Sequence, residues 1–198
     1  MKKVLFLVFV LLPVLAFANG RIEGLADEYF EIANAYAELK NYDKALEFYK
    51  KASVDKKYTN ACEYNSARMY GLKNEWKESE KILAKLHKQE PENQMILEAY
   101  AYSLVAVGKT ENGKDIYKEL AEKNSEDPKM LLNYLHVLVF AKDYATAKTE
   151  VEKAILKFPS VEERSSFDKI QKEIEKELSN KEAEQAKPTK SNDKPNKD

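Results

Sequence analysis

Apolar and polar residues alternate along this chain at helical spacing, and the whole pattern returns every 34 residues between Ala26 and Phe158. Within each block, apolar residues recur at steps of three and four, which is the spacing of one face of an α-helix. Two columns of mainly small residues and three of mainly large ones stay in register: Ala33, Ala67, Ala101 and Leu135; Ala45, Ser79, Gly113 and Ala147; Tyr36, Tyr70, Leu104 and Leu138; Tyr42, Trp76, Thr110 and Tyr144; Tyr49, Leu83, Tyr117 and Val151. A period of this length is typical of stacked helical hairpins. The pattern predicts an all-α fold with four hairpins, over residues 26–59, 60–93, 94–127 and 128–161.

The small residues allow two helices to approach closely, and the aromatic residues fill the space beside them. In the first two blocks the small and aromatic positions are Ala33, Tyr36, Tyr42, Ala45, Tyr49 and Ala52, then Ala67, Tyr70, Trp76, Ser79 and Leu83, with Pro91 ending the second block. These columns resemble the tetratricopeptide repeat family over all four blocks. The resemblance implies a right-handed α-solenoid, in which the first helix of each hairpin lines a concave groove that binds a protein or a peptide.

A single amphipathic helix is expected after the last block. Phe167, Ile170, Ile174 and Leu178 form one apolar stripe on an otherwise charged segment, and a solenoid needs such a helix to close its open end. We therefore expect a capping helix over residues 162–178, with a partner-binding helix as the alternative. Residues 179–198 contain no large apolar side chain, so we expect them to form a disordered tail.

The first 18 residues have the composition of a secretory signal peptide. Lys2 and Lys3 precede the apolar run Val4–Ala18, which is shorter than the ~20 residues of a membrane-spanning helix. We expect cleavage after Ala18 and no stable membrane span afterwards; an uncleaved anchor is the alternative. No cysteine follows the apolar run, so the sequence predicts no lipoprotein anchor and places the protein in the periplasm or cell envelope. The composition, rich in Lys, Glu, Asn and Tyr, is typical of a bacterial protein.

Charge and motifs indicate no catalytic or nucleic-acid-binding role. The chain has 33 basic and 34 acidic residues and a net charge of −1, which provides no attraction for nucleic acid. It contains no glycine-rich phosphate loop, no GxSxG sequence and no HExxH pair. His87 and His136 are far apart, and neither has a second ligand at metal-binding spacing. We therefore expect no cofactor, no metal and no enzyme activity. The single cysteine, Cys62, cannot form an intramolecular disulfide, so stability must come from packing.

The expected groove is lined by first-helix residues that lie outside the packing columns. They are Phe30, Asn34, Glu38, Tyr64, Asn65, Arg68, Glu98, Tyr102, Lys129, Leu132, His136 and Phe140. A carboxylate clamp, a known use of this groove in the family, is not expected, because Phe30, Met95 and Ala99 stand where it needs basic residues.

We expect Phe30, Tyr64 and Tyr102 to anchor a bound peptide segment, since aromatic side chains carry much of the binding energy at protein interfaces. Arg68 and Lys129 are expected to orient the peptide, with Asn34 and His136 on the same face. For the three aromatic residues, helix packing is the alternative, and His136 is either a half-buried packing residue or a groove residue.

The sequence thus predicts a non-catalytic scaffold or adaptor for protein–protein interaction in the bacterial cell envelope. Two alternatives stay open. One is a self-associating structural component, which would be a homo-oligomer. The other is an accessory binding subunit of an envelope enzyme such as a peptidoglycan remodeller.

Overall fold

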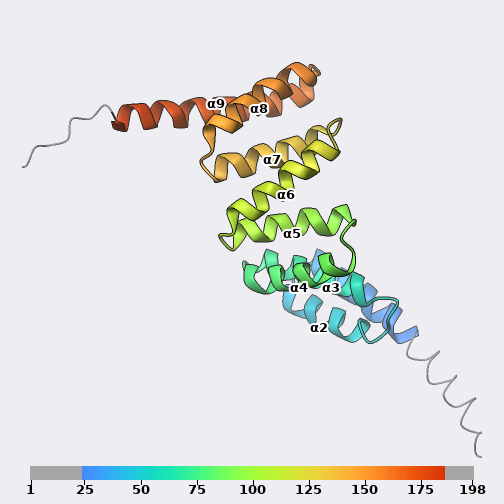
Figure 1. Cartoon of the computed structure of the whole chain (residues 1–198). Coiled ribbons are helices and arrows are strands. Elements are labelled where there is room, and N and C mark those ends of the chain that lie inside the picture. The colour runs from blue at the N-terminus through green and yellow to red at the C-terminus, as the bar shows by residue number, and fades with distance from the viewer. Residues whose placement is uncertain (1–23, 186–198) are drawn as a thin grey trace, which may run out of the picture. The chain divides into compact units, whose positions relative to one another are not determined.

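The structure, a computed structural model, describes residues 24–185 and contains helices but no strands over that range. The helices are residues 24–38, α2 (Tyr42–Ala52), α3 (Thr59–Leu72), α4 (Trp76–Gln89), α5 (Gln94–Ala106), α6 (Thr110–Lys123), α7 (Pro128–Phe140), α8 (Tyr144–Lys157) and α9 (Val161–Gln185) (Figure 1). The predicted all-α fold of helical hairpins with an added C-terminal helix is confirmed. The expected signal peptide and residues 186–198 lie outside the described residues. Between residues 24 and 185, no helix is long and apolar enough to span a membrane.

The turn inside each hairpin repeats at the same 34-residue interval. Backbone φ is positive at Lys40 (58°), Asn74 (62°), Gly108 (87°) and Lys142 (58°). At each turn the next amide donates to the carbonyl five residues earlier, at 2.8–2.9 Å, which is the usual way that a left-handed residue ends a helix. Asn41 and Asp143 then cap the following helices through their side-chain oxygens.

The described residues form two compact units, 24–113 and 114–185, with α6 beginning in the first and continuing into the second. In the first unit the helices pack in chain order, α2 on α3, α3 on α4 and α4 on α5. Ala33, Ala67 and Ala101 are fully buried, and Tyr49 and Leu83 fill the space beside them. The repeating columns are therefore the core of this unit.

Glycine marks the closest approach between two helices of the first unit. A Cβ atom on Gly113 would lie 2.6 Å from Val105 Cγ2 and 2.7 Å from the Ala101 carbonyl oxygen. Even alanine is too large there without a shift of the backbone, since contacts under 3 Å are strongly repulsive. The small-residue column therefore contains glycine at the position where α6 meets α5.

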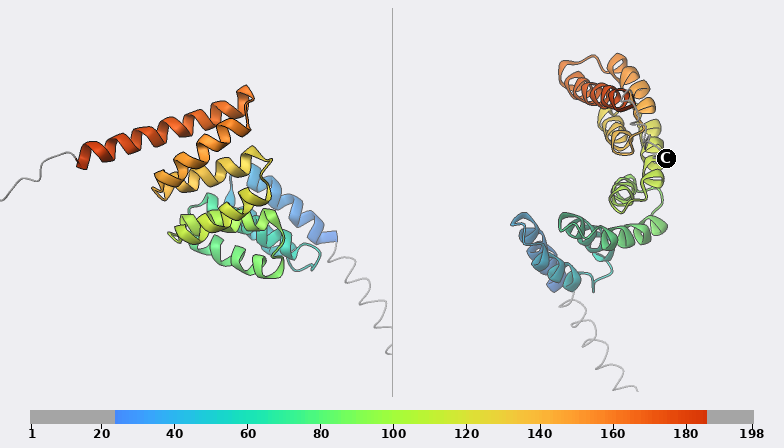
Figure 2. Two further views of the ribbon diagram at one scale, coloured as in Figure 1. Left: turned by 45° about the horizontal axis from the view of Figure 1, so that its top comes forward. Right: turned by 90° about the vertical axis from the view of Figure 1, so that its left-hand side faces the viewer.

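The second unit is built from the rest of α6 with α7, α8 and α9. Leu135, Val151, Phe167 and Ile174 are fully buried, and the Phe158 ring stacks on Phe167 with 5.8 Å between centroids. α9 packs along α8 and also touches α7 (Figure 2). Its apolar stripe is thus buried against the last hairpin.

α9 is longer than the sequence indicated. It continues to Gln185, whereas the capping helix was expected to end at residue 178 and the tail to begin at Ser179. The Lys181 ammonium lies 4.6 Å from the centroid of the Tyr144 ring, and the Tyr144 hydroxyl donates to Glu177 at 3.5 Å. These contacts with α8 stabilise the extra turns, which corrects the predicted start of the tail.

Candidate functional site

The candidate site consists of first-helix positions that the packing columns leave uncovered. Four columns at 34-residue spacing make up what we call the groove face: Asp27, Ala61, Met95 and Lys129; Phe30, Tyr64, Glu98 and Leu132; Asn34, Arg68, Tyr102 and His136; Glu38, Leu72, Ala106 and Phe140. None of these residues is buried, and all seven predicted site residues are among them. In each column the first three residues belong to the first unit and the fourth, on α7, belongs to the second, so each unit presents its own part of the groove face.

Phe30 and Asn34 are held by contacts within the first hairpin. The Phe30 ring is half-buried, stacks on Tyr58 at 4.9 Å and meets Tyr49 edge-on at 5.8 Å. Asn34 Oδ1 accepts a hydrogen bond of 2.8 Å from the Tyr49 hydroxyl. Burial raises the pKa of that hydroxyl, which keeps it protonated as a donor. Phe30 therefore has only part of its ring available to a ligand.

Tyr64 and Arg68 lie one turn apart on α3 and differ in exposure. The Tyr64 ring is half-buried against the core that contains Ala67 and Leu83, and burial raises the pKa of its hydroxyl. Arg68 is exposed, and its Nη1 donates to Asn65 Oδ1 at 3.2 Å. In this pair, Arg68 presents the accessible group and Tyr64 contributes mainly to packing.

An apolar row follows on α3 and α5. Leu72, Met95 and Tyr102 are 54%, 57% and 55% exposed, and the Tyr102 ring lies against Trp76 with 5.3 Å between centroids. Tyr102 was a predicted anchor, whereas Leu72 and Met95 were not. The 34-residue interval from Glu38 to Leu72 and from Met95 to Lys129 is the signal that could have identified them.

The second unit presents its own part of the groove face on α7. Lys129, His136 and Phe140 are exposed, and Phe140 is 63% exposed despite its apolar ring. The backbone amide of Lys129 donates to the carboxylate of Asp127, which caps α7, at 2.9 Å. The side-chain ammonium of Lys129 takes no part in this hydrogen bond. His136 is thus exposed and not half-buried.

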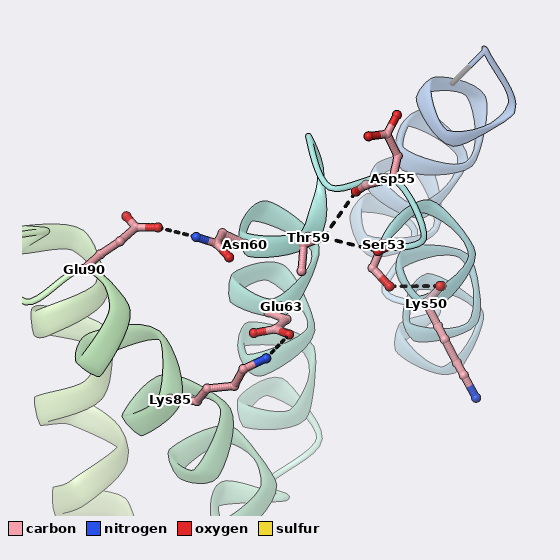
Figure 3. Close-up of polar contacts among 8 residues, drawn as sticks. All are labelled: Lys50, Ser53, Asp55, Thr59, Asn60, Glu63, Lys85 and Glu90. Atoms are coloured by element: carbon pink, nitrogen blue, oxygen red, sulfur yellow. Dashed lines mark hydrogen bonds and ion pairs between the residues drawn. The ribbon is translucent and has the colours of Figure 1, made fainter. Parts of the chain in front are cut away.

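Two clefts lie between successive second helices, at equivalent positions in the two units. The first, of about 400 Å³, is lined by α2, α3 and α4 and includes Lys50 and Lys85. The second, of about 350 Å³, is lined by α6, α7 and α8 and includes Lys118 and Lys153. An ion pair between Lys85 of α4 and Glu63 of α3 lies in the first cleft (Figure 3).

Neither a metal-binding cluster nor a reactive cysteine is found among the residues that the structure describes. Within residues 24–185, no three His, Cys, Asp or Glu side chains converge to hold a metal ion. Cys62 is buried, and burial raises the pKa of its thiol to about 11. The thiol is thus protonated near neutral pH and lacks the thiolate character of a reactive cysteine.

Comparisons with known proteins relate this chain to one curated relative and to solved helical-repeat structures, while no family model matches it. A protein of Treponema pallidum (strain Nichols), named "Uncharacterized lipoprotein", is 39% identical over 143 residues, which are 72% of this chain and 73% of the relative. A tetratricopeptide repeat protein from Parabacteroides merdae has a TM-score of 0.64 and 16% identity over 81% of this chain, which spans 64% of that structure. YrrB, a tetratricopeptide repeat protein with an unusual peptide-binding site, has a TM-score of 0.60 and 17% identity over 85% of this chain and 97% of its own. At such identities the two structures establish the fold alone.

The name of the relative contradicts the predicted localisation. The sequence excluded a lipoprotein anchor because no cysteine follows the apolar run, and Cys62 lies buried in α3. The Treponema pallidum relative, being named a lipoprotein, points instead to a lipidated envelope protein. The prediction was wrong because it relied on one residue type at one place, and the packing of the repeats contains no information about a lipid.

Proposed function

Because this chain has the helical-repeat fold of tetratricopeptide repeat proteins, we propose that it is a non-catalytic protein-interaction scaffold that holds a peptide segment against its groove face. The tetratricopeptide repeat structures it resembles favour a protein-interaction role. The peptide as ligand, the groove face as its site and the absence of catalysis are our proposals.

The observation that carries the proposal is the exposure of large apolar side chains in the groove-face columns. Leu72, Met95 and Tyr102 in the first unit and Phe140 in the second are each more than half exposed. Exposed apolar surface costs free energy, and clusters of it commonly mark interaction sites. A bound segment with apolar side chains would cover this surface.

Charged groups beside the apolar row favour a peptide over a purely apolar ligand. Arg68 is exposed one turn from Leu72, and Glu98 lies one turn from Tyr102 on α5. The guanidinium of Arg68 can form two parallel hydrogen bonds with a carboxylate of the segment. The peptide-binding site named for YrrB supports this use of the fold, although the identity of 17% does not transfer its residues.

The test separates binding from stability at single groove-face positions. A photo-crosslinking side chain at position 102 would capture the bound segment, whose affinity is then measured for Tyr102→Ala and Arg68→Ala. Each change is expected to weaken binding by ~1–3 kcal/mol with little effect on thermal melting, because both side chains are exposed. Phe30→Ala and Tyr64→Ala are expected to lower the melting temperature, because their rings pack in the core.

Leu156→Ala is the matched control, since Leu156 is 83% exposed on α8 and lies outside the groove-face columns. Equal loss of affinity in this variant, or no loss in the Tyr102 and Arg68 variants, would contradict the proposal.

We also infer that the protein works at the cell envelope as a lipidated protein, in line with the name of its Treponema pallidum relative. Labelling of cells with a radioactive fatty acid, followed by detergent phase separation, measures this directly. Label on the chain and recovery in the detergent phase are expected. An unlabelled chain in the aqueous phase would contradict the inference.

A further inference from the structure

A second exposed apolar surface lies on the first helix, outside the groove face. Leu25, Ile32 and Leu39 are 40%, 38% and 76% exposed. They follow one another at seven-residue intervals, which is about two helical turns, so they form one stripe that ends just after residue 38. Tyr29 and Tyr36 lie beside them, and both rings contact Phe48 of α2, at 5.9 and 5.5 Å between centroids. We call Leu25, Tyr29, Ile32, Tyr36, Leu39 and Phe48 the N-terminal end face.

The next hairpin shows what covers the equivalent surface inside the repeat array. Glu63, Ser66 and Tyr70 of α3 are the counterparts, 34 residues on, of Tyr29, Ile32 and Tyr36. They line the cleft at which α2 packs on α3. In the end face, by contrast, Leu25, Ile32 and Leu39 are exposed within residues 24–185, whereas α9 packs on the last hairpin.

Opposite charges border the two long edges of the N-terminal end face. Glu28 and Glu31 are exposed along the edge formed by the first helix. Lys44 and Lys51 border the edge formed by α2, where both pair with the intervening Glu47 at 2.8 and 2.7 Å. The Lys51 ammonium lies 4.4 Å from the Phe48 ring centroid, so this basic edge directly adjoins the apolar centre.

We propose that a second copy of this chain covers the N-terminal end face, with the first helix of each copy lying along α2 of the other. A two-fold axis parallel to the helices brings the acidic edge of one copy to the basic edge of its partner, on both sides of the interface. A two-fold axis across the helices would instead place the two first helices together, with their glutamates adjacent. Charge complementarity therefore favours the first arrangement, which is also closed and self-complementary.

The dimer is tested by sedimentation velocity on the purified chain over a range of concentrations. The double variant Ile32→Glu/Leu39→Glu places four carboxylates in the proposed apolar centre of the dimer. It is expected to raise the dimer dissociation constant by more than about 100-fold, because each buried leucine-sized side chain is worth one to two orders of magnitude. Leu156→Glu, at an exposed leucine of α8, is the control and should leave the dimer unchanged.

Charge reversal distinguishes the two arrangements. Glu28 and Lys51 lie at the same level of the hairpin, since the Lys51 ammonium is 5.8 Å from the Tyr29 ring centroid. Glu28→Lys and Lys51→Glu should each weaken the dimer by about tenfold, and the combined variant should recover most of the loss. Thermal melting of each variant confirms that it is folded. A wild-type chain that stays monomeric up to about 100 µM, a concentration at which a dimer with a Kd of about 1 µM would be almost fully formed, would overturn the proposal. So would a dimer insensitive to the two end-face glutamates, or a combined variant weaker than both single ones.

Discussion

At the scale of single residues, the hairpin turns show one backbone conformation adopted by different side chains. Positive φ is found at Lys40, Asn74, Gly108 and Lys142, although only glycine adopts it without steric strain. A Cβ on Gly108 would meet no other atom within 4 Å. Substitution there therefore reports backbone strain alone.

We expect opposite effects from two matched substitutions at these turns. Gly108→Ala should destabilise the protein by ~1 kcal/mol, because a side chain disfavours the left-handed conformation. Lys142→Gly should stabilise it by up to ~1 kcal/mol for the same reason, since Lys142 is exposed. Urea denaturation followed by circular dichroism measures both. If both substitutions shifted the midpoint in the same direction, the turn conformation would not be the cause.

Residue exposure also separates the predicted site residues into two groups. Tyr102, Arg68, Lys129 and His136 are exposed on the groove face, while Phe30 and Tyr64 are half-buried in aromatic and aliphatic contacts. Helical spacing placed all of them on one face of their helices. It could not show how much of each ring the neighbouring helix covers, because that depends on residues distant in the sequence such as Tyr58.

At the scale of elements, α9 combines a closing role with an extension along α8. Its buried stripe, Phe167, Ile170 and Ile174, covers apolar surface of the last hairpin. Beyond the stripe, the contact between Lys181 and Tyr144 holds further turns. The helix therefore has a strongly packed first part and a weakly held second part.

Three truncations should produce graded effects on the melting temperature. Removal of residues 186–198 should change it by no more than about one or two degrees, because this segment contains no large apolar side chain that folding could bury. Removal from Ser179 should lower the free energy of unfolding by a further ~0.5–1 kcal/mol, because the Lys181–Tyr144 contact is lost. The melting temperature should fall accordingly. Removal from Phe167 should lower it sharply, because three buried side chains are lost. Equal melting temperatures for the three chains would refute the capping role of α9.

At the scale of the whole molecule, both units bury groups that become charged only at high pH. Burial raises the pKa of Tyr49, Tyr64 and the Cys62 thiol in the first unit and of Tyr134 and Tyr144 in the second. A raised folded-state pKa of this kind contributes stability below the unfolded-state pKa, and this stability is lost as pH rises through the folded-state value.

Stability should therefore be unchanged between about pH 7 and pH 9 and decline above pH 9. Cys62 alone should account for a loss on the order of 2 kcal/mol between its ordinary pKa of 9.0 and its raised pKa of about 11. Urea midpoints at closely spaced pH values measure the decline. Cys62→Ala, whatever its effect at pH 7, should make the curve flatter between pH 9 and 11. An unchanged slope in this variant would show that the thiol does not contribute.

The sequence by itself determined the period, the hairpins, the buried columns and part of the groove-face columns of this protein. These features depend on spacing within about 34 residues and on side-chain size, which local geometry translates directly into helix faces and close contacts. The prediction that the protein has no lipoprotein anchor is contradicted by the name of its Treponema pallidum relative, and neither helical spacing nor packing reports such a modification.

Only the tertiary structure decided which groove-face aromatic residues are exposed, how far α9 extends, and that the first helix is left with an uncovered apolar stripe. Each of these depends on whether a helix from elsewhere in the chain covers a given side chain. Periodicity repeats the same surface in every hairpin, and the burial of that surface is set by the neighbour that packs on it.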